Sequence, residues 1–485
     1  MPALRVLFTS SEIYPLIKTG GLADISYALP QALQQQDVDI RVLTIAYPTI
    51  LDAVQTQCIY EEVHVFVGFD TVRLLKATLP NSEITLYLVD CPRLYQRVGN
   101  PYCDETGQDW EDNGLRFGML AKVAAFFGSH YFDFKPDLIH CNDWQTGLTP
   151  AFLKYSCLNT TKTLMTIHNI AYQGIFDPTI MRDLNLPAES FNIFGLEYHG
   201  LLSYLKAGLY YSNWISTVSP TYATEIQTPE FGYGLYGLLA HRQHQLTGIL
   251  NGIDTDIWHP ATDPYLTTPY DKDHLAIKDE NKIALCHYLG LAPQTNLPII
   301  GMISRLTYQK GIDLILPIIP QILAEGAQLV ILGTGEKELE HDLQTLMKQF
   351  PQQLSVTIGY NEKLAHWIEA GCDIFLMPSR FEPCGLNQMY SMQYGTLPLV
   401  HHTGGLADTV VNTTPKTIDK GIATGFSFTQ NDSQHILQTI QHALLIFRNQ
   451  ALWKQVQWQA MSCDFSWTNS ALSYLKLYKK ITSKS

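Results

Sequence analysis

The hexapeptide TGGLAD occurs twice in this chain, at residues 19–24 and again at residues 403–408. Each copy follows an apolar run that predicts a β-strand, residues 4–10 in the first half and 396–401 in the second, and each begins a segment with helical periodicity. Glycine lets the backbone turn sharply and expose N–H groups, so both helix starts are expected to approach an anion or a sugar closely. A structural turn used twice is the alternative interpretation.

Around both copies, apolar runs alternate with longer helical segments, which is typical of βα units on a parallel sheet. The alternation occurs in two successive sets. Helices are expected at residues 114–132, 144–155 and 466–481. The expected strands lie at 4–10, 40–46, 84–90, 136–142, 162–168, 215–219 and 248–254 in the first set, and at 298–304, 327–332, 354–359, 373–378 and 396–401 in the second.

A stretch rich in Pro, Thr and Asp, residues 255–270, indicates a linker between the two sets. With 485 residues, of which 46% are hydrophobic, the chain is long enough for two hydrophobic cores. We therefore predict an α/β protein with an N-terminal domain of residues 1–255, joined by a C-terminal helix at 466–485, and a second domain of residues 256–465.

Composition excludes several classes of partner. A net charge of −13, from 32 basic and 45 acidic residues, argues against binding to a nucleic acid. Apolar runs stay short of the roughly 18 residues that a membrane span needs, so we expect no membrane partner. Nine cysteines without a CxxC pair fit a reducing compartment, and Met1 leads directly into a strand rather than a signal peptide. We expect a cytoplasmic protein.

In open α/β sheets, ligands bind beyond the carboxyl ends of the strands, and polar residues found there are the first candidates for a site. In the first half these are Lys18, Gly20, Gly21, Asp24, Asn142, Asp143, Trp144, His168 and Asn169. In the second half they are Arg305, Lys310, Tyr360, Arg380, Glu382, Cys384 and residues 403–406.

Arg305 and Lys310 lie in SRLTYQKG, between a predicted strand and a predicted helix. Two fixed cations there suit a diphosphate that departs bearing charge, because electrostatic stabilisation is usually the largest catalytic contribution. Taken singly, a loop arginine or lysine is more often a solvated surface group.

The segment SRFEPCGLNQ places Glu382 and Cys384 on a loop that leads into a helix, where Gly385 and Leu386 offer backbone N–H groups. Glu382 is open to three roles: a general acid, a partner for sugar hydroxyls, or a carboxylate that stabilises the helix start. Cys384 could act as a nucleophile, but a buried and inert thiol is the commoner case.

Three apparent cofactor motifs are incomplete. GTGE, starting at Gly333, lacks the third glycine of a dinucleotide fingerprint, and the Asp254-Thr255-Asp256 triplet lies in the linker, where aspartates are usually solvated or cap a turn. His140-Cys141 lacks the spacing of a zinc site. We predict no metal ion and no cofactor.

Several longer motifs together resemble those of bacterial glycogen synthases and plant starch synthases. The resemblance extends from the first strand to FSW at residues 465–467, essentially the whole chain. It rests on KTGGLAD at Lys18, CNDWQTGL at Cys141, TIHNIAYQG at Thr166, LKAG at Leu205, TVSPTYA at Thr217, LNGID at Leu250, SRLTYQKG at Ser304, SRFEPCGLNQ at Ser379 and HTGGLADTV at His402.

The resemblance implies a GT-B fold, in which two facing Rossmann-like domains enclose a cleft and the C-terminal domain holds the donor. It implies transfer of glucose from ADP-glucose to the 4-hydroxyl at the non-reducing end of an α-1,4-glucan or maltooligosaccharide. The reaction proceeds with retention and without a metal, and the departing phosphate itself takes the acceptor's proton.

The same resemblance assigns roles to matching residues. His168, Asp143, Arg305, Lys310 and Glu382 are the catalytic set; Lys18, Gly20, Gly21, Asp24, Asn251, Tyr360, Cys384, Gly385, Leu386, Thr403 and Gly404 contact the donor; Trp144 and Asn169 line the sugar pocket.

Two departures from the family pattern keep alternatives open. Tyr236 stands where an acidic residue is expected, and His402 precedes TGGL where an arginine is common. The alternatives are a GT-B transferase that uses a UDP-sugar, and a weakly active relative that binds glucan or assists initiation.

Overall fold

The computed structural model describes residues 3–61, 63–66, 72–129, 131–156 and 161–483; Cys157 lies outside these ranges. The chain divides into two compact units, Met1–Leu250 with Trp467–Ser485, and Asn251–Ser466. The sequence pattern places the corresponding boundaries at 255/256 and 465/466. Within the described ranges, no helix is long and apolar enough to cross a membrane.

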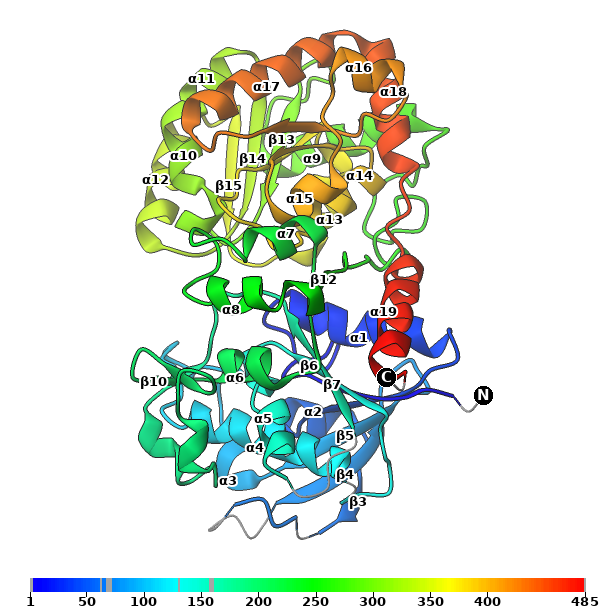
Figure 1. Ribbon diagram of the computed structural model, residues 1–485. Helices are drawn as coiled ribbons and strands as arrows, with labels where there is room; N and C mark the ends of the chain where they lie inside the picture. The colour runs from blue at the N-terminus through cyan, green and yellow to red at the C-terminus, as the bar shows by residue number, and fades with distance from the viewer. Residues whose placement is uncertain (1–2, 62, 67–71, 130, 157–160, 484–485) are drawn as a thin grey trace. The chain divides into compact units, whose positions relative to one another are not determined.

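The first unit is built on a nine-stranded sheet in the order β12-β11-β7-β6-β1-β2-β5-β4-β3 (Figure 1). The strands from β12 to β5 are parallel, and β4 and β3 add an antiparallel edge. Their bounds are β1 (Arg5–Thr9), β2 (Asp39–Ile45), β3 (Gln57–Tyr60), β4 (Arg73–Thr78), β5 (Thr85–Asp90), β6 (Leu138–Asn142), β7 (Lys162–Ile167), β11 (Trp214–Thr217) and β12 (Leu246–Gly248).

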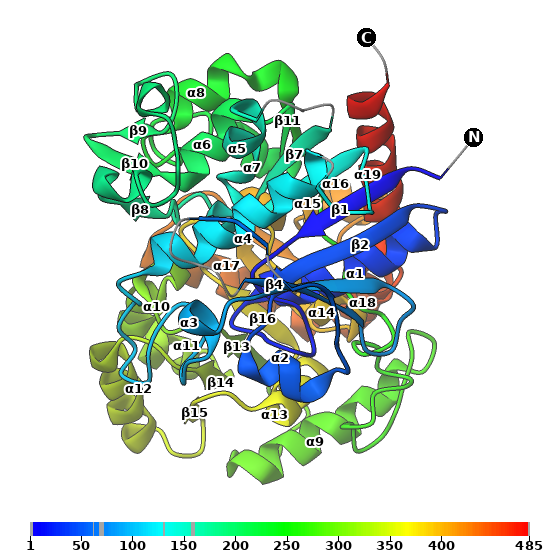
Figure 2. The same ribbon diagram turned by 90° about the horizontal axis from the view of Figure 1, so that it is seen from below.

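Helices cover this sheet, and the last one returns from the far end of the chain to lie beside α1 (Figures 1 and 2). A separate small sheet has the order β8-β10-β9. The bounds are α1 (Gly21–Gln34), α2 (Pro48–Ala53), α3 (Pro92–Tyr95), α4 (Asn113–Gly128), η1 (Trp144–Thr146), α5 (Thr149–Lys154), α6 (Tyr204–Tyr211), α7 (Pro220–Glu225), α8 (Tyr236–His241) and α19 (Trp467–Thr482), with β8 (Ile175–Phe176), β9 (Glu197–Tyr198) and β10 (Leu201–Ser203).

The second unit has six parallel strands in the order β15-β14-β13-β16-β17-β18. They are β13 (Ile299–Ile303), β14 (Gln328–Gly333), β15 (Leu354–Ile358), β16 (Ile374–Met377), β17 (Leu397–His401) and β18 (Phe426–Phe428). The helices are α9 (Lys278–Leu289), η6 (Tyr308–Lys310), α10 (Ile312–Ile315), α11 (Ile319–Ala324), α12 (Lys337–Gln349), α13 (Glu362–Gly371), α14 (Asn387–Gln393), α15 (Gly404–Thr409), α16 (Pro415–Asp419), α17 (Ser433–Arg448) and α18 (Gln450–Met461).

The predicted α/β class with two sets of parallel strands is confirmed, and two local predictions are wrong. The strand expected at 248–254 ends at Gly248, because the chain then leaves the sheet and Ile253 pairs with Ser466 of the second unit instead. The helix expected at 144–155 is broken into η1 and α5, with Pro150 in the first turn of α5, where its missing N–H costs nothing.

Both sheets reverse their strand order once. In the first unit the chain runs from β1 through β2 to β5 in one direction and from β6 through β7 to β11 and β12 in the other, so the reversal lies between β1 and β6. In the second unit it lies between β13 and β16. Ligands of open α/β sheets bind at such reversals, beside the loops that follow the two central strands.

Candidate functional site

The loop after β1 is folded around one carboxylate. Glu12 is 3% exposed and accepts hydrogen bonds from the Thr19 backbone N–H at 2.5 Å, the Thr19 hydroxyl at 2.6 Å and the Gly20 N–H at 3.2 Å. The hydroxyl of Tyr102 donates to the same carboxylate. Hydrogen bonds to an ionised acceptor are about twice as strong as neutral ones, so this carboxylate fixes residues 19 and 20.

Tyr102 extends this network to the loop after β6. Its oxygen accepts a hydrogen bond from the Gln145 side-chain amide at 3.2 Å and lies 3.0 Å from the Ser11 hydroxyl. Gln145 belongs to η1, which begins directly after Asp143. The two loops that flank the strand reversal are therefore tied together through one phenol.

Several N–H groups of the two TGGLAD copies donate hydrogen bonds to neighbouring loops of their own unit. Thr19 and Gly20 donate to Glu12, and in the second copy Gly405 donates to the carbonyls of Glu382 at 3.2 Å and Pro383 at 3.1 Å. The expectation that these N–H groups are exposed to a ligand is wrong for all three, because neighbouring loops already occupy them.

The copies also differ in backbone conformation. Gly20 has an extended φ of −157°, and a Cβ atom there would meet nothing within 4 Å. Gly404 has φ +45°, and a Cβ atom would lie 1.9 Å from the carbonyl oxygen of Glu382. Of these two positions, only Gly404 requires glycine sterically, and the residue before it, Thr403, is buried.

Lys18 and Asp24 form an ion pair at the start of α1. The Lys18 Nζ lies 2.8 Å from Asp24 Oδ1, and the two side chains are 39% and 29% exposed. Surface pairs of this kind contribute little to stability, about 0 to 1 kcal/mol. Gly21, the first residue of α1, lies between them in the sequence. The pair therefore places a cation at the helix start while contributing little to stability.

Asp143 follows β6 with φ 53°, a strained conformation for a residue other than glycine. Its carboxylate accepts hydrogen bonds from the backbone N–H groups of His168 at 2.7 Å and Asn169 at 3.5 Å. Burial raises the pKa of Asp143 to about 7, although these two hydrogen bonds oppose the shift. The carboxylate thus joins the loops after β6 and β7.

His168 is held as a neutral ring. Asn142 donates from its amide nitrogen to the carbonyl of Thr9 at 2.9 Å, so its oxygen faces His168 and accepts from Nε2 at 2.9 Å. Burial lowers the pKa of His168 to about 3. Nδ1 is buried and has no hydrogen-bond partner within the described ranges. Its lone pair is therefore suited to accept a hydrogen bond from a substrate hydroxyl.

Trp144 and Asn169 contribute more to local structure. The Trp144 ring packs edge-on against Phe117, with centroids 4.8 Å apart, and a Cβ atom at Gly174 would lie 2.3 Å from it. The Asn169 side chain accepts from the Ala171 N–H at 3.0 Å. Trp144 is therefore half-buried by packing within the first unit.

In the second unit, an ion pair spans the reversal between β13 and β16. Lys310 Nζ lies 2.5 Å from Glu382 Oε2, and the Ser379 hydroxyl donates to the same oxygen at 2.9 Å. The Lys310 and Glu382 side chains are only 17% and 10% exposed. Glu382 bonds to these partners rather than to the start of α14. Arg305, which follows β13, is exposed, and its Nη2 donates to Gln309 at 3.1 Å.

The segment after Glu382 is buried. Cys384 is 5% exposed, and burial raises the pKa of its thiol to about 12, so it is a neutral thiol at physiological pH rather than a nucleophile. Asn251 interacts with this thiol, and its own side-chain oxygen is buried without a hydrogen-bond partner among the described residues. Gly385 has φ +70° and Leu386 precedes α14.

Tyr360 differs from these residues because its side chain is exposed rather than buried. It is 80% exposed between β15 and α13, and its hydroxyl donates to Glu362. Its ring is accessible to a planar ligand, and none of the buried contacts above involves it.

Across the described ranges, no group of three or more His, Cys, Asp or Glu side chains is arranged to hold a metal ion. Asp254 instead accepts hydrogen bonds from the N–H groups of Asp256 at 2.9 Å and Ile257 at 3.2 Å, which is how a turn-capping aspartate behaves.

The sequence-based selection misses several residues of these networks, among them Glu12, Tyr102 and Ser379. Glu12 and Ser379 lie in the loops that begin at the ends of β1 and β16, so the strand-end rule that selected their neighbours could have found them. Tyr102 lies far along the chain from either reversal, and no local pattern marks it.

Comparison with known proteins matches both halves of the chain. Residues 5–241 match the family described as starch synthase catalytic domain, and residues 291–451 match glycosyl transferases group 1. The chain is 47% identical to a glycogen synthase of Nitrosomonas eutropha over 99% of its length and 97% of the relative. It is 49% identical to a glycogen synthase of Dechloromonas aromatica over 99% of both chains.

Solved structures give the same picture. The catalytic domain of starch synthase IV from Arabidopsis thaliana, bound to ADP and acarbose, is 31% identical, with a TM-score of 0.89 over 99% of this chain and 100% of that one. Sucrose-phosphate synthase from Thermosynechococcus elongatus, at 16% identity and a TM-score of 0.60 over 99% and 100% of the two chains, shares the fold.

Proposed function

Because this chain belongs to the glycogen synthase family and is a glycosyltransferase of the GT-B fold, we propose that it extends an α-1,4-glucan with glucose from ADP-glucose, with retention of configuration. The family and fold that the sequence motifs imply are confirmed. We propose further that the second unit holds the donor and the first unit the glucan.

The ion pair between Lys310 and Glu382 is the observation that carries the proposal. It places a cation and a carboxylate together at a strand reversal, where α/β proteins bind their ligands. A departing ADP gains charge on its terminal phosphate, and in this proposal Lys310 and Arg305 stabilise that charge. Glu382 holds Lys310 in position and offers its other oxygen to a sugar hydroxyl.

Retention fits a transfer on one face of the glucosyl ring. The bond from glucosyl C1 to the phosphate oxygen breaks, and a bond from C1 to the acceptor's 4-oxygen forms on the same side. The acceptor's proton passes to the departing phosphate, so a covalent glucosyl-enzyme and a glycosidase-like pair of carboxylates are not required. In this scheme neutral His168 orients a sugar hydroxyl through Nδ1, and Asp143 holds the His168 backbone.

The proposed donor-binding residues are the eleven that the family resemblance assigns: Lys18, Gly20, Gly21, Asp24, Asn251, Tyr360, Cys384, Gly385, Leu386, Thr403 and Gly404. Lys18 is charged and partly exposed, which suits contact with a phosphate, and the exposed ring of Tyr360 suits stacking on adenine. We propose that no metal ion or cofactor takes part, and that the enzyme works in the cytoplasm, for which the eight described cysteines, all unpaired thiols, give support.

The experiment is incubation with radiolabelled ADP-glucose or UDP-glucose together with glycogen. Incorporation from ADP-glucose supports the proposal. Incorporation only from UDP-glucose identifies the alternative transferase, which the starch synthase IV complex with ADP does not favour. Incorporation from neither donor, with glycogen still bound, leaves the weakly active relative that Tyr236 and His402 suggest.

A further inference from the structure

One arginine joins the two loops that flank the strand reversal of the second unit. Arg380 follows β16, and its guanidinium forms two parallel hydrogen bonds with the carboxylate of Asp313 in α10, at 2.8 and 2.7 Å. The same group donates to the carbonyl of Tyr308 at 2.5 Å and lies over the Tyr308 ring, 3.4 Å from its centroid. A planar fork that bonds at its edge and stacks on its face holds its partners in one orientation.

The main chain beside Arg380 adds to this contact. The Arg380 N–H donates to the carbonyl of Gln309 at 2.9 Å, and the Gln309 side chain donates to the carbonyl of Phe381 at 3.3 Å. At Gly311, which has φ +72°, a Cβ atom would lie 2.3 Å from the carbonyl oxygen of Pro378. The loop after β13 is therefore fitted closely against the segment that follows β16.

Lys310 lies inside this closely fitted loop. Its side chain forms the ion pair with Glu382. A departing diphosphate would compete with Glu382 for the Lys310 ammonium, so that pair cannot by itself keep the loop in place during the reaction. The contacts of Arg380 do not depend on the pair, because they go to Asp313 and to main-chain atoms.

We propose that Arg380 is a positioning residue for glucosyl transfer, which fixes the loop after β13 so that Lys310 meets the leaving phosphate in a reactive geometry. The inference rests on the proposed function. Three of the five guanidinium N–H groups are used in the bonds to Tyr308 and Asp313, so Arg380 acts on the loop rather than on the donor.

The test is a double-mutant cycle on kcat, with ADP-glucose and glycogen as substrates. A shift of about 1 Å in a catalytic group can cost on the order of 10²-fold in rate, so Arg380→Ala should lower kcat roughly 10- to 100-fold. In a Lys310→Ala background the same substitution should lower kcat by at most about threefold, because the group that it positions is absent. An equal factor in both backgrounds would overturn the proposal.

Two further variants separate geometry from charge and from folding. Arg380→Lys keeps the positive charge but cannot form the fork, so its kcat should stay within about threefold of that of Arg380→Ala. A wild-type kcat in Arg380→Lys would overturn the proposal, because charge alone would then suffice. Asp313→Asn keeps the arginine and one acceptor oxygen, and should lower kcat roughly three- to tenfold, again only when Lys310 is present. This variant decides the question if Arg380→Ala does not fold.

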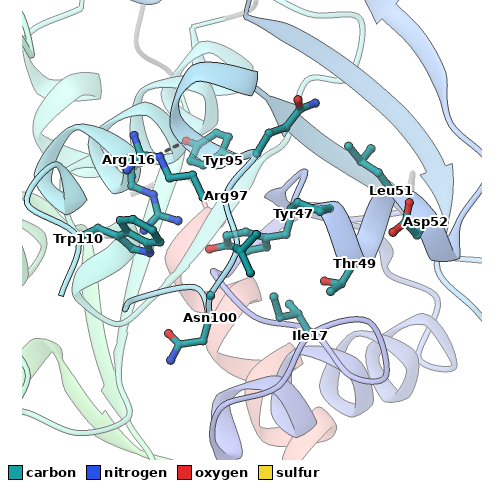
Figure 3. Close-up of a pocket in the computed structure, with 14 residues that line it drawn as sticks. Ile17, Tyr47, Thr49, Leu51, Asp52, Tyr95, Arg97, Asn100, Trp110 and Arg116 are labelled. Carbon is teal, nitrogen blue, oxygen red and sulfur yellow. Dashed lines mark hydrogen bonds between the residues drawn. The ribbon is translucent and has the colours of Figure 1, made fainter. Parts of the chain in front are cut away.

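Arg97 of the first unit is the matched control. It lies over the Trp110 ring, 5.0 Å from the centroid (Figure 3), and donates to the Asp112 carboxylate at 2.7 and 2.5 Å and to the carbonyl of Arg93 at 3.1 Å. Arg97→Ala therefore removes the same types of contact outside the second unit. Its effect on kcat should be the same factor in both backgrounds, and a strong coupling to Lys310 would overturn the proposal.

Failure of the proposed function gives a different result. A wild type that transfers glucose from neither ADP-glucose nor UDP-glucose would refute that function. Hydrogen exchange then decides whether Arg380 fixes the loop: the amides of residues 306–311 should exchange faster in Arg380→Ala than in the wild type and in Arg97→Ala, and unchanged exchange would overturn this role. An active wild type with an unaltered kcat in Arg380→Ala would overturn the positioning role alone.

Discussion

Truncation of Lys310 tests the proposed mechanism most directly. As the donor bond breaks, charge grows on the departing phosphate, so a fixed ammonium stabilises the transition state more than the ground state. Losing one preorganised group of this kind typically lowers kcat by about 10²-fold to 10³-fold, or roughly 3 to 4 kcal/mol. Lys310→Ala should therefore act mainly on kcat rather than on KM.

The contacts of Lys310 also determine how much stability its truncation should cost. If Lys310 were a solvated surface group, the alternative that the sequence leaves open, its truncation would change stability by less than about 0.5 kcal/mol. A larger cost is expected because Lys310 is the ion-pair partner of Glu382, whose side chain is only 10% exposed. Removing one partner of a buried pair costs about 3 to 5 kcal/mol, and the Ser379 hydroxyl that remains should reduce this to on the order of 2 kcal/mol.

The double variant Lys310→Ala with Glu382→Gln separates the two effects. It removes the uncompensated carboxylate and should recover most of the stability in urea unfolding, while kcat stays low because the cation is still absent. The assay is kcat with ADP-glucose and glycogen beside the midpoint of unfolding for all variants. A kcat of Lys310→Ala within threefold of the wild type would refute the role assigned to Lys310.

The remaining predictions concern the loops and the metal. Gly404→Ala should sharply reduce activity and melting temperature, because its Cβ atom would lie 1.9 Å from the Glu382 carbonyl oxygen, whereas Gly20→Ala should leave the melting temperature within about 2 °C of the wild type. The pKa of Asp143 is raised from 3.8 to about 7 in the folded protein, so the folded state binds this proton more tightly than the unfolded state. The resulting stabilisation is present below about pH 4 and is lost as pH rises through 7. As pH rises from 5 to 8, the free energy of unfolding of Asp143→Asn in urea should therefore increase relative to that of the wild type, by at most on the order of 1 kcal/mol per pH unit. The same pH dependence in both proteins would contradict the raised pKa. Activity should survive excess EDTA, and a complete loss that added metal reverses would rule out the metal-free assignment.

The strand-end rule uses only the order of elements along the chain, and it selects residues that the structure brings into contact. Asp143 and His168 follow neighbouring strands, and the structure joins the Asp143 carboxylate to the His168 N–H at 2.7 Å. Lys310 and Glu382, which are 72 residues apart in the chain, meet because β13 and β16 are neighbours in the sheet. Hydrophobic periodicity predicts the strands, but it does not encode which strands lie side by side.

Atomic roles within the site depend on longer-range contacts that the sequence does not display. The neutral state of His168 follows from its burial and from the orientation of Asn142, which the carbonyl of Thr9 determines. The burial of Cys384 that makes its thiol inert is likewise a tertiary property. Composition and motif identify the residue types, and only packing assigns their protonation.

The two TGGLAD copies show how one hexapeptide serves two different loops. In each unit a glutamate in the loop after a central strand receives the N–H groups of the copy, but it does so with different atoms. Glu12 uses its side-chain carboxylate for Thr19 and Gly20, whereas Glu382 uses its main-chain carbonyl for Gly405. In the first arrangement the Glu12 carboxylate is occupied by these hydrogen bonds. Gly20 remains extended, and a Cβ atom there would meet open space. The second requires close backbone approach, hence the positive φ of Gly404, and it leaves the Glu382 carboxylate available for Lys310. The same six residues are therefore fixed by a side-chain carboxylate in the first unit and by a main-chain carbonyl in the second, where the carboxylate of Glu382 pairs with Lys310.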